Sequence, residues 1–152
     1  MKQTHKLAST LLLLFLLHPL TAQEKGDWRA SSKTAKSTTG DIAFTDQKLY
    51  INFSAFTVAQ IRTLTPAEIT AAFALDAPPT GTGNLYRTSI PAGKKFVHSH
   101  TLCGGEDTEW VVTYLTGHTL QLLFFSGQDL PILTPDAIST STTLCGVYGY
   151  SR

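Results

Sequence analysis

Two apolar runs separated by a short polar segment form the clearest pattern in the chain. The runs "EWVVTYL" and "LQLLFFSG" flank "TGHT", and glycine at the first central position favours a type II′ hairpin turn. Both faces of this hairpin are largely apolar, so we expect it to be central, with one face on the core and the other covered by a helix, a loop or a partner. Pairing outward from Gly117-His118 predicts this register: Leu115 opposite Leu120, Thr113 opposite Leu122 and Val111 opposite Phe124 on one face, and Tyr114 opposite Gln121, Val112 opposite Leu123 and Trp110 opposite Phe125 on the other.

Shorter stretches with a period of two predict further strands on both sides of this hairpin. Ile42 and Phe44 alternate with polar neighbours, and after a polar connection Leu49, Ile51 and Phe53 share one face of a second strand. Residues 84–90 predict another strand, with residues 94–97 as its return. The last strand, residues 144–150, places its two tyrosines on one face and Cys145 and Val147 on the other.

One short helix is expected between these strands. Thr65-Pro66-Ala67-Glu68 has the spacing of a capping box, with proline where its missing N–H costs nothing. Ile69 and Phe73 then lie on one face, and the loop of residues 76–83 ends the helix. About seven to nine short strands with one short helix predict a mainly β fold, a small antiparallel β-barrel or sandwich.

The first 22 residues have the layout of a secretory signal peptide. A basic start with Lys2 and Lys6 precedes the apolar run of residues 11–17, and Ala22 supplies a small residue before a cleavage point. The apolar run is shorter than the ~20 residues that a membrane-spanning helix needs, although an uncleaved anchor is the alternative. We therefore expect a signal peptide at 1–22 and a single exported β domain at 23–152, periplasmic or secreted and without a membrane span after cleavage.

Export changes the interpretation of the only two cysteines, Cys103 and Cys145. Thiols tend to pair in an oxidising compartment, whereas in the cytosol the same pair would suggest a metal or catalytic role. A disulfide here would close a loop of roughly forty residues and stabilise the fold by about 4 kcal/mol in the chain-entropy model. Their spacing excludes a CxxC redox pair.

The net charge limits the kinds of partner that this protein is expected to bind. Without Lys2 and Lys6, ten basic residues stand against eleven acidic ones, and no basic patch occurs in the sequence. This balance argues against a nucleic-acid partner and against adhesion to anionic membranes.

Few residues have a spacing that predicts chemistry. His98 and His100, two apart on an expected strand, are weak candidates for a metal site with His118, but no carboxylate stands at a diagnostic spacing. The sequence lacks a G-x-S-x-G elbow, and a carboxylate pair drawn from Glu106, Asp107 and Glu109 fits a solvated turn better. No cofactor motif occurs, so the sequence predicts a protein without a cofactor and without catalytic residues.

Six segments occur in an order that indicates a resemblance. Together they resemble small uncharacterised exported proteins of Gram-negative bacteria with a TAxSxTGDI-like opening, an LYR strand and two LCG cysteine motifs. The resemblance implies an exported location and supports the disulfide. The segments are Thr34–Phe44, Leu85–Thr88, Thr101–Gly105, Val111–Leu115, Leu122–Gly127 and Leu144–Tyr150.

These observations favour a binding protein over an enzyme. We expect a non-enzymatic β-barrel that binds a small apolar ligand or an envelope protein; periplasmic lysozyme inhibitors are similar in architecture, but their loop motif is absent. The alternatives are a lysozyme-inhibitor-like protein binder or a hydrolase with an unpatterned serine or carboxylate site. The candidate binding residues, which could also simply fill the core, are Trp110, Tyr114, Phe125, Tyr148 and Tyr150.

Overall fold

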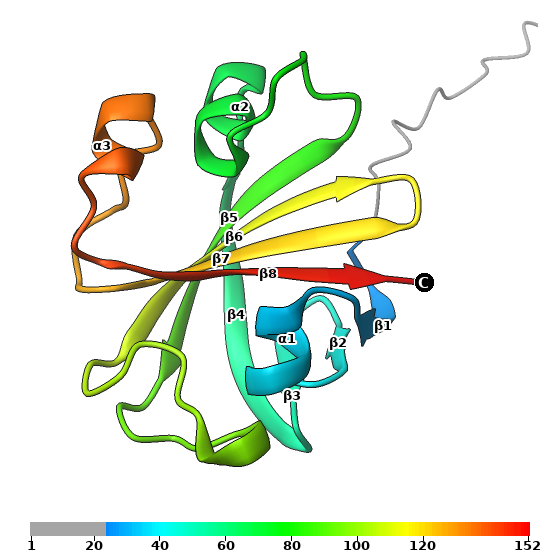
Figure 1. The fold of residues 1–152 in the computed structure, drawn as a ribbon, viewed down its shortest axis with the longest axis vertical. Coiled ribbons are helices and arrows are strands. Elements are labelled where there is room, and N and C mark those ends of the chain that lie inside the picture. Colours follow the sequence, from blue (N-terminus) through cyan, green and yellow to red (C-terminus); the bar gives the residue numbers. More distant parts are fainter. Residues whose placement is uncertain (1–23) are drawn as a thin grey trace, which may run out of the picture.

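Eight antiparallel strands follow one another around a closed barrel, and the last strand pairs with the first (Figure 1). The structure is a computed structural model that describes residues 24–152, so the expected signal peptide at 1–22 lies outside the described residues. The predicted mainly β fold is confirmed, as a barrel. Its strands are β1 (Gly26–Ala30), β2 (Ile42–Phe44), β3 (Lys48–Ile51), β4 (Ser54–Thr63), β5 (Thr82–Ile90), β6 (Thr108–Thr116), β7 (Thr119–Ser126) and β8 (Leu144–Ser151).

Three short helices accompany the barrel, where the sequence predicted one: α1 (Lys33–Thr38), α2 (Pro66–Phe73) and α3 (Pro135–Ser139). The predicted helix is α2, and its capping box is present, with Glu68 N donating to Thr65 Oγ1 and Thr65 N donating to Glu68 Oε2. The other two helices have six and five residues, too few to show a helical period in the sequence.

The β6–β7 hairpin has the predicted register at all six pairs, and Gly117 has the positive φ, 54°, that its turn position requires. One face lies inside the barrel, where Val111, Leu122 and Phe124 are fully buried. The other face packs with residues of α2 and α3 in a second cluster outside the barrel wall. The expected coverage of both faces is therefore confirmed.

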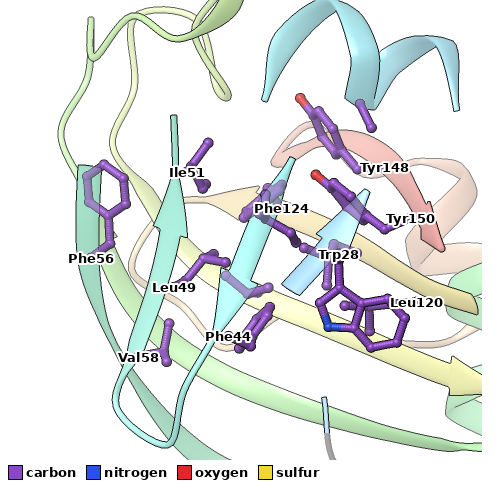
Figure 2. Close-up of a cluster of buried hydrophobic side chains, with 14 of the residues drawn as sticks. Trp28, Phe44, Leu49, Ile51, Phe56, Val58, Leu120, Phe124, Tyr148 and Tyr150 are labelled. Carbon is purple, nitrogen blue, oxygen red and sulfur yellow. The ribbon is translucent and has the colours of Figure 1, made fainter. Parts of the chain in front are cut away.

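Large side chains fill the barrel interior. Figure 2 shows side chains from most of the strands pointing into one cluster, among them Trp28, Leu49, Phe124 and Tyr150, none of which is more than 1% exposed. The alternation predicted for residues 42–44 and 49–51 explains how their apolar side chains reach this interior.

Helix α1 closes one end of the barrel against β8. Ala35 of α1 is fully buried in the interior cluster, and Thr39, which follows the helix, has its Oγ1 2.7 Å from the Tyr150 hydroxyl. Beside it the predicted disulfide is confirmed: Cys103, in the β5–β6 loop, is bonded to Cys145 of β8, with 4.9 Å between their Cα atoms. This end, which we call the α1 end, is thus closed by apolar packing and a covalent bond.

Two strand predictions are wrong. Residues 94–97 do not form a return strand; they lie in the β5–β6 loop, which makes a turn from Pro91 to Lys94 and enters the 3₁₀ turn η1 (Val97–Ser99). Phe53 does not share the buried face of Leu49 and Ile51, because the strand ends at Ile51 and the chain turns at residues 52 and 53.

Candidate functional site

The turn between β3 and β4 presents the most unusual side chain on the surface. Asn52 and Phe53 both have positive φ, 45° and 65°, and the Phe53 side chain is fully exposed, at 103% relative to an extended reference. A hairpin turn with two positive φ angles favours Asn followed by Gly, so phenylalanine at its second position is both strained and without a packing role. We call Phe53 and its neighbours Asn52 and Tyr50, itself 39% exposed, the hairpin tip.

A groove of about 650 Å³ runs beside the hairpin tip. Strands β1 to β3 and the hairpin tip contribute most of its lining, and Gly40 and Val97 border it from the end of α1 and from η1. Gly40 needs to be glycine here, because its φ is 64° and a Cβ would stand 3.2 Å from a Val97 methyl group. The tip and the groove therefore form one continuous surface, which extends from the α1 end along β1 and β2 to Arg152.

Charged groups of both signs line this groove. Asp41 lies on one side, where its Oδ1 accepts a hydrogen bond from Ala30 N at 2.9 Å. Arg152 lies on another, with its guanidinium 4.2 Å from the centre of the Trp28 ring and a hydrogen bond from Nη1 to the Lys25 carbonyl. An aromatic tip next to a groove with a mixed charged rim has the composition of a protein-binding surface, in which aromatic residues anchor and polar groups surround them.

The aromatic residues predicted to bind do not form one surface. Trp110, Tyr114 and Phe125 are at most 7% exposed and pack in the outer cluster with residues of α2 and α3. Tyr148 and Tyr150 lie inside the barrel with their hydroxyl ends toward α1 (Figure 2). Burial raises the pKa of both tyrosines, so their hydroxyls stay protonated.

The three candidate metal-binding histidines lie at two ends of the barrel. His98 and His100 flank Ser99 at η1, not on a strand, with ring centres 6.3 Å apart, and His98 Nδ1 lies 3.4 Å from the Ser37 carbonyl. His118 lies in the β6–β7 turn, at the opposite end of β6 from that loop. Within residues 24–152 no three His, Cys, Asp or Glu side chains come together in a metal-binding arrangement.

The three candidate acids around the start of β6 lie in different surroundings. Asp107 Oδ1 accepts from Ala92 N at 2.6 Å, which ties the two ends of the β5–β6 loop together. Glu109 pairs with Arg87 at 2.5 Å on the outside of the barrel, where the Arg87 guanidinium also covers the Trp110 ring. Glu106 remains exposed, so these carboxylates do not face one another across a cleft.

Two residues that the sequence did not single out stand out in the structure. Phe53 could have been found from a change of phase: Leu49 and Ile51 are buried at odd positions and Phe56 and Val58 at even positions, which requires a turn between the two pairs. Glu24, in the polar stretch before β1, has a buried side chain at the other end of the barrel from α1, and no local signal marks it.

Comparisons with known families, proteins and structures found no similar protein. No protein-family model, no curated protein and no solved structure matches this chain. None of the helices formed by residues 24–152 has both the length and the apolar character needed to cross a bilayer.

Proposed function

We propose that this protein is an exported, non-enzymatic β-barrel that binds an envelope protein, and that Phe53 at the hairpin tip is the anchor of the interface. The full exposure of a phenylalanine in a strained turn carries the proposal. Backbone strain of about 1–3 kcal/mol persists where function requires it. Phe53 gives the fold no packing in return, since its side chain touches solvent on all sides.

The rest of the molecule supports a protein partner over an apolar ligand inside the barrel. The interior is filled by its own side chains, so a ligand there would have to displace core residues such as Phe124 and Tyr148. The groove of about 650 Å³ beside the tip is open to the surface and can receive side chains of a partner. We infer a partner with an apolar pocket wide enough for one phenyl ring, rimmed by groups that complement Asp41 and Arg29, which both line the groove.

The same proposal includes an exported location and a role in binding rather than in catalysis. The Cys103–Cys145 disulfide and the leader-like first 22 residues are typical of exported proteins, and the resemblance to the exported group with two LCG motifs is consistent with both. Asp107 and Glu109 are engaged by Ala92 and Arg87, and His118 lies at the opposite end of β6 from His98 and His100, which favours binding over hydrolysis. Insertion of a hairpin tip into a partner's cleft would be similar in mode to a periplasmic lysozyme inhibitor.

Replacing Phe53 with glycine separates the strain that this residue causes in the turn from its proposed role as the anchor of the interface. Glycine adopts the positive φ without strain, so we expect F53G to be more stable than the wild type by about 0.5–1 kcal/mol in urea unfolding. We expect the same variant to lose its partner. A photo-crosslinking amino acid at Tyr50, in cells that export the protein, should yield one crosslinked species with Phe53 present and none with F53G.

Ile132 supplies the matched control, because it is an exposed apolar residue, 69% accessible, in the β7–β8 connection. I132G should leave the crosslink at position 50 unchanged. If F53G retains the crosslink, or if I132G abolishes it equally, Phe53 is not the anchor and the proposal fails.

A further inference from the structure

A buried carboxylate lies at the end of the barrel opposite α1, far from the hairpin tip. Glu24 precedes β1, is only 6% exposed, and accepts three side-chain hydrogen bonds. Asn84 Nδ2 donates to Oε1 at 2.9 Å, the Thr113 hydroxyl donates to the same oxygen, and the Tyr86 hydroxyl donates to Oε2. All three donors are neutral groups, and Lys25, the next residue, is paired with Asp46.

The three donors, which we call the cradle, are fixed by the barrel wall. Asn84 and Tyr86 lie on β5, and Thr113 lies opposite Asn84 on β6. The Asn84 Oδ1 atom accepts from Gln60 Nε2 at 2.8 Å and from Thr63 Oγ1 at 3.1 Å, so the amide must turn its NH₂ group toward Glu24. The cradle is therefore oriented by contacts that do not involve Glu24.

The segment that carries Glu24 is held by fewer interactions than the cradle. Strand β1 pairs with β2 at three positions and with β8 at two, whereas β5 and β6 pair at seven. Outside these strand pairs the segment is held by the Trp28 Nε1 hydrogen bond to the Glu24 carbonyl, 2.7 Å, by the Arg152 Nη1 hydrogen bond to the Lys25 carbonyl, 2.9 Å, and by the surface Lys25–Asp46 ion pair. Opening a segment with so few strand pairs costs less free energy than opening the barrel wall.

A cavity of about 250 Å³ adjoins the cradle. The rings of Phe44 and Tyr86 supply its apolar surface, Gln60 and Thr63 are polar, and the Lys25–Asp46 pair lies at its edge. This volume is below the roughly 300–1,000 Å³ of pockets that hold drug-sized molecules, so it suits a smaller compound.

We propose that the cradle is a binding site for a small carboxylic acid with an apolar body, and that Glu24 is its built-in competitor. When the segment before β1 moves aside, the ligand's carboxylate takes the three hydrogen bonds and its apolar part lies against Phe44 and Tyr86. Hydrogen bonds to an ionised acceptor are about twice as strong as neutral ones, which gives the site its preference for an anion. Because Glu24 competes for the same hydrogen bonds, the apparent affinity equals the intrinsic affinity of the open cradle multiplied by the fraction of molecules in which the cradle is open.

Glu24→Ala tests this competition directly. Sodium phenylacetate is the probe, with phenylacetamide and sodium chloride of equal ionic strength as controls, and the readouts are the thermal unfolding midpoint and calorimetric titration. We expect E24A to bind phenylacetate at least tenfold more tightly than the wild type and its midpoint to rise saturably, with no response to phenylacetamide. Adding Tyr86→Phe to E24A should remove most of this gain.

Asp27→Ala is the matched control, because it removes an exposed carboxylate from the same segment and leaves the cradle occupied; it should behave as the wild type. If E24A does not fold, Glu24→Gln keeps the size of the side chain, removes its charge, and should also bind phenylacetate more tightly than the wild type. Equal responses to phenylacetate and phenylacetamide, or equal affinities in the wild type and in whichever variant folds, would overturn the proposal.

Discussion

The two ends of this barrel are closed by different physical means. At the α1 end the buried Ala35 of α1, the Cys103–Cys145 disulfide and the Tyr150–Thr39 hydrogen bond close the interior. At the opposite end, which we call the Glu24 end, a single carboxylate from the segment before β1 occupies a polar cradle beside a cavity. The first closure includes a covalent bond, whereas the second consists of hydrogen bonds to a carboxylate, and we propose that another carboxylate can replace it.

This difference assigns different tasks to the two ends. The strained Phe53 turn lies at the α1 end, where the disulfide and the helix hold the neighbouring loops, and strain persists only when its surroundings are rigid. The cradle lies at the Glu24 end, where the segment that carries Glu24 is held by fewer strand pairs. The comparison predicts that substitutions at the two ends will differ in size and in their response to solution conditions.

Removing the disulfide should have the largest effect. Its partners are 42 residues apart, so the C103S/C145S variant should lose about 4 kcal/mol of unfolding free energy, because its unfolded chain regains the freedom of that loop. Urea unfolding at pH 7 measures the loss, and dithiothreitol should destabilise the wild type equally while leaving the variant unchanged. A loss below about 1 kcal/mol would mean that the α1 end is closed by packing alone.

Two buried tyrosines allow a matched comparison of the ends. Tyr86→Phe removes a donor from the Glu24 carboxylate and should cost about 2 kcal/mol, as for hydrogen bonds to charged groups. Tyr150→Phe removes a bond to the Thr39 hydroxyl, which keeps its contacts with two carbonyl groups, and should cost about 1 kcal/mol.

The pKa of Tyr86 is raised well above its ordinary value, because the side chain is buried and faces the Glu24 carboxylate, so its hydroxyl remains a donor at pH 7. Urea unfolding of both variants at this pH therefore reports hydrogen bonds and not ionisation. Equal costs, or a larger cost for Tyr150→Phe, would contradict the contrast between a charged and a neutral closure.

The sequence predicted the features that depend on local pattern. The β6–β7 register followed from the apolar runs and a glycine turn, and the capping box of α2 from four residues. The disulfide followed from two cysteines and a leader, because compartment and number leave few alternatives. In each case the determining residues are adjacent in the chain or are the only ones of their type.

The features that were missed depend on barrel closure or on strained turns. Glu24 is 60 residues from Asn84 and 89 from Thr113, and only the closed barrel brings them together. The Asn52-Phe53 turn lacks the glycine by which such turns are recognised, so its phenylalanine was assigned to a buried face. The predicted aromatic residues fill the two clusters, since an aromatic pattern alone does not distinguish a core from a surface.

The smallest expected effect, and the one most dependent on pH, comes from Glu68 of α2. Two hydrogen bonds from the Arg62 guanidinium, 2.6 and 2.8 Å, lower the pKa of Glu68 to about 2 from its ordinary value of 4.5. A lowered folded pKa stabilises the protein above the unfolded value, and that stability disappears as the pH falls from about 4.5 to about 2. Because the pair is partly exposed to solvent, we expect it to contribute at most about 1 kcal/mol.

Glu68→Gln keeps the capping box, since glutamine also reaches back to the N-cap, and removes only the charge. We therefore expect E68Q to be less stable than the wild type in urea at pH 7, and this deficit to be smaller at pH 2, where about half of the Glu68 carboxyl groups of the folded protein are protonated. Glu106→Gln, an exposed acid in the β5–β6 loop, controls for the general effect of losing a negative charge. A deficit of E68Q that persists unchanged at pH 2 would show that Glu68 stabilises α2 through its shape and not through its pairing with Arg62.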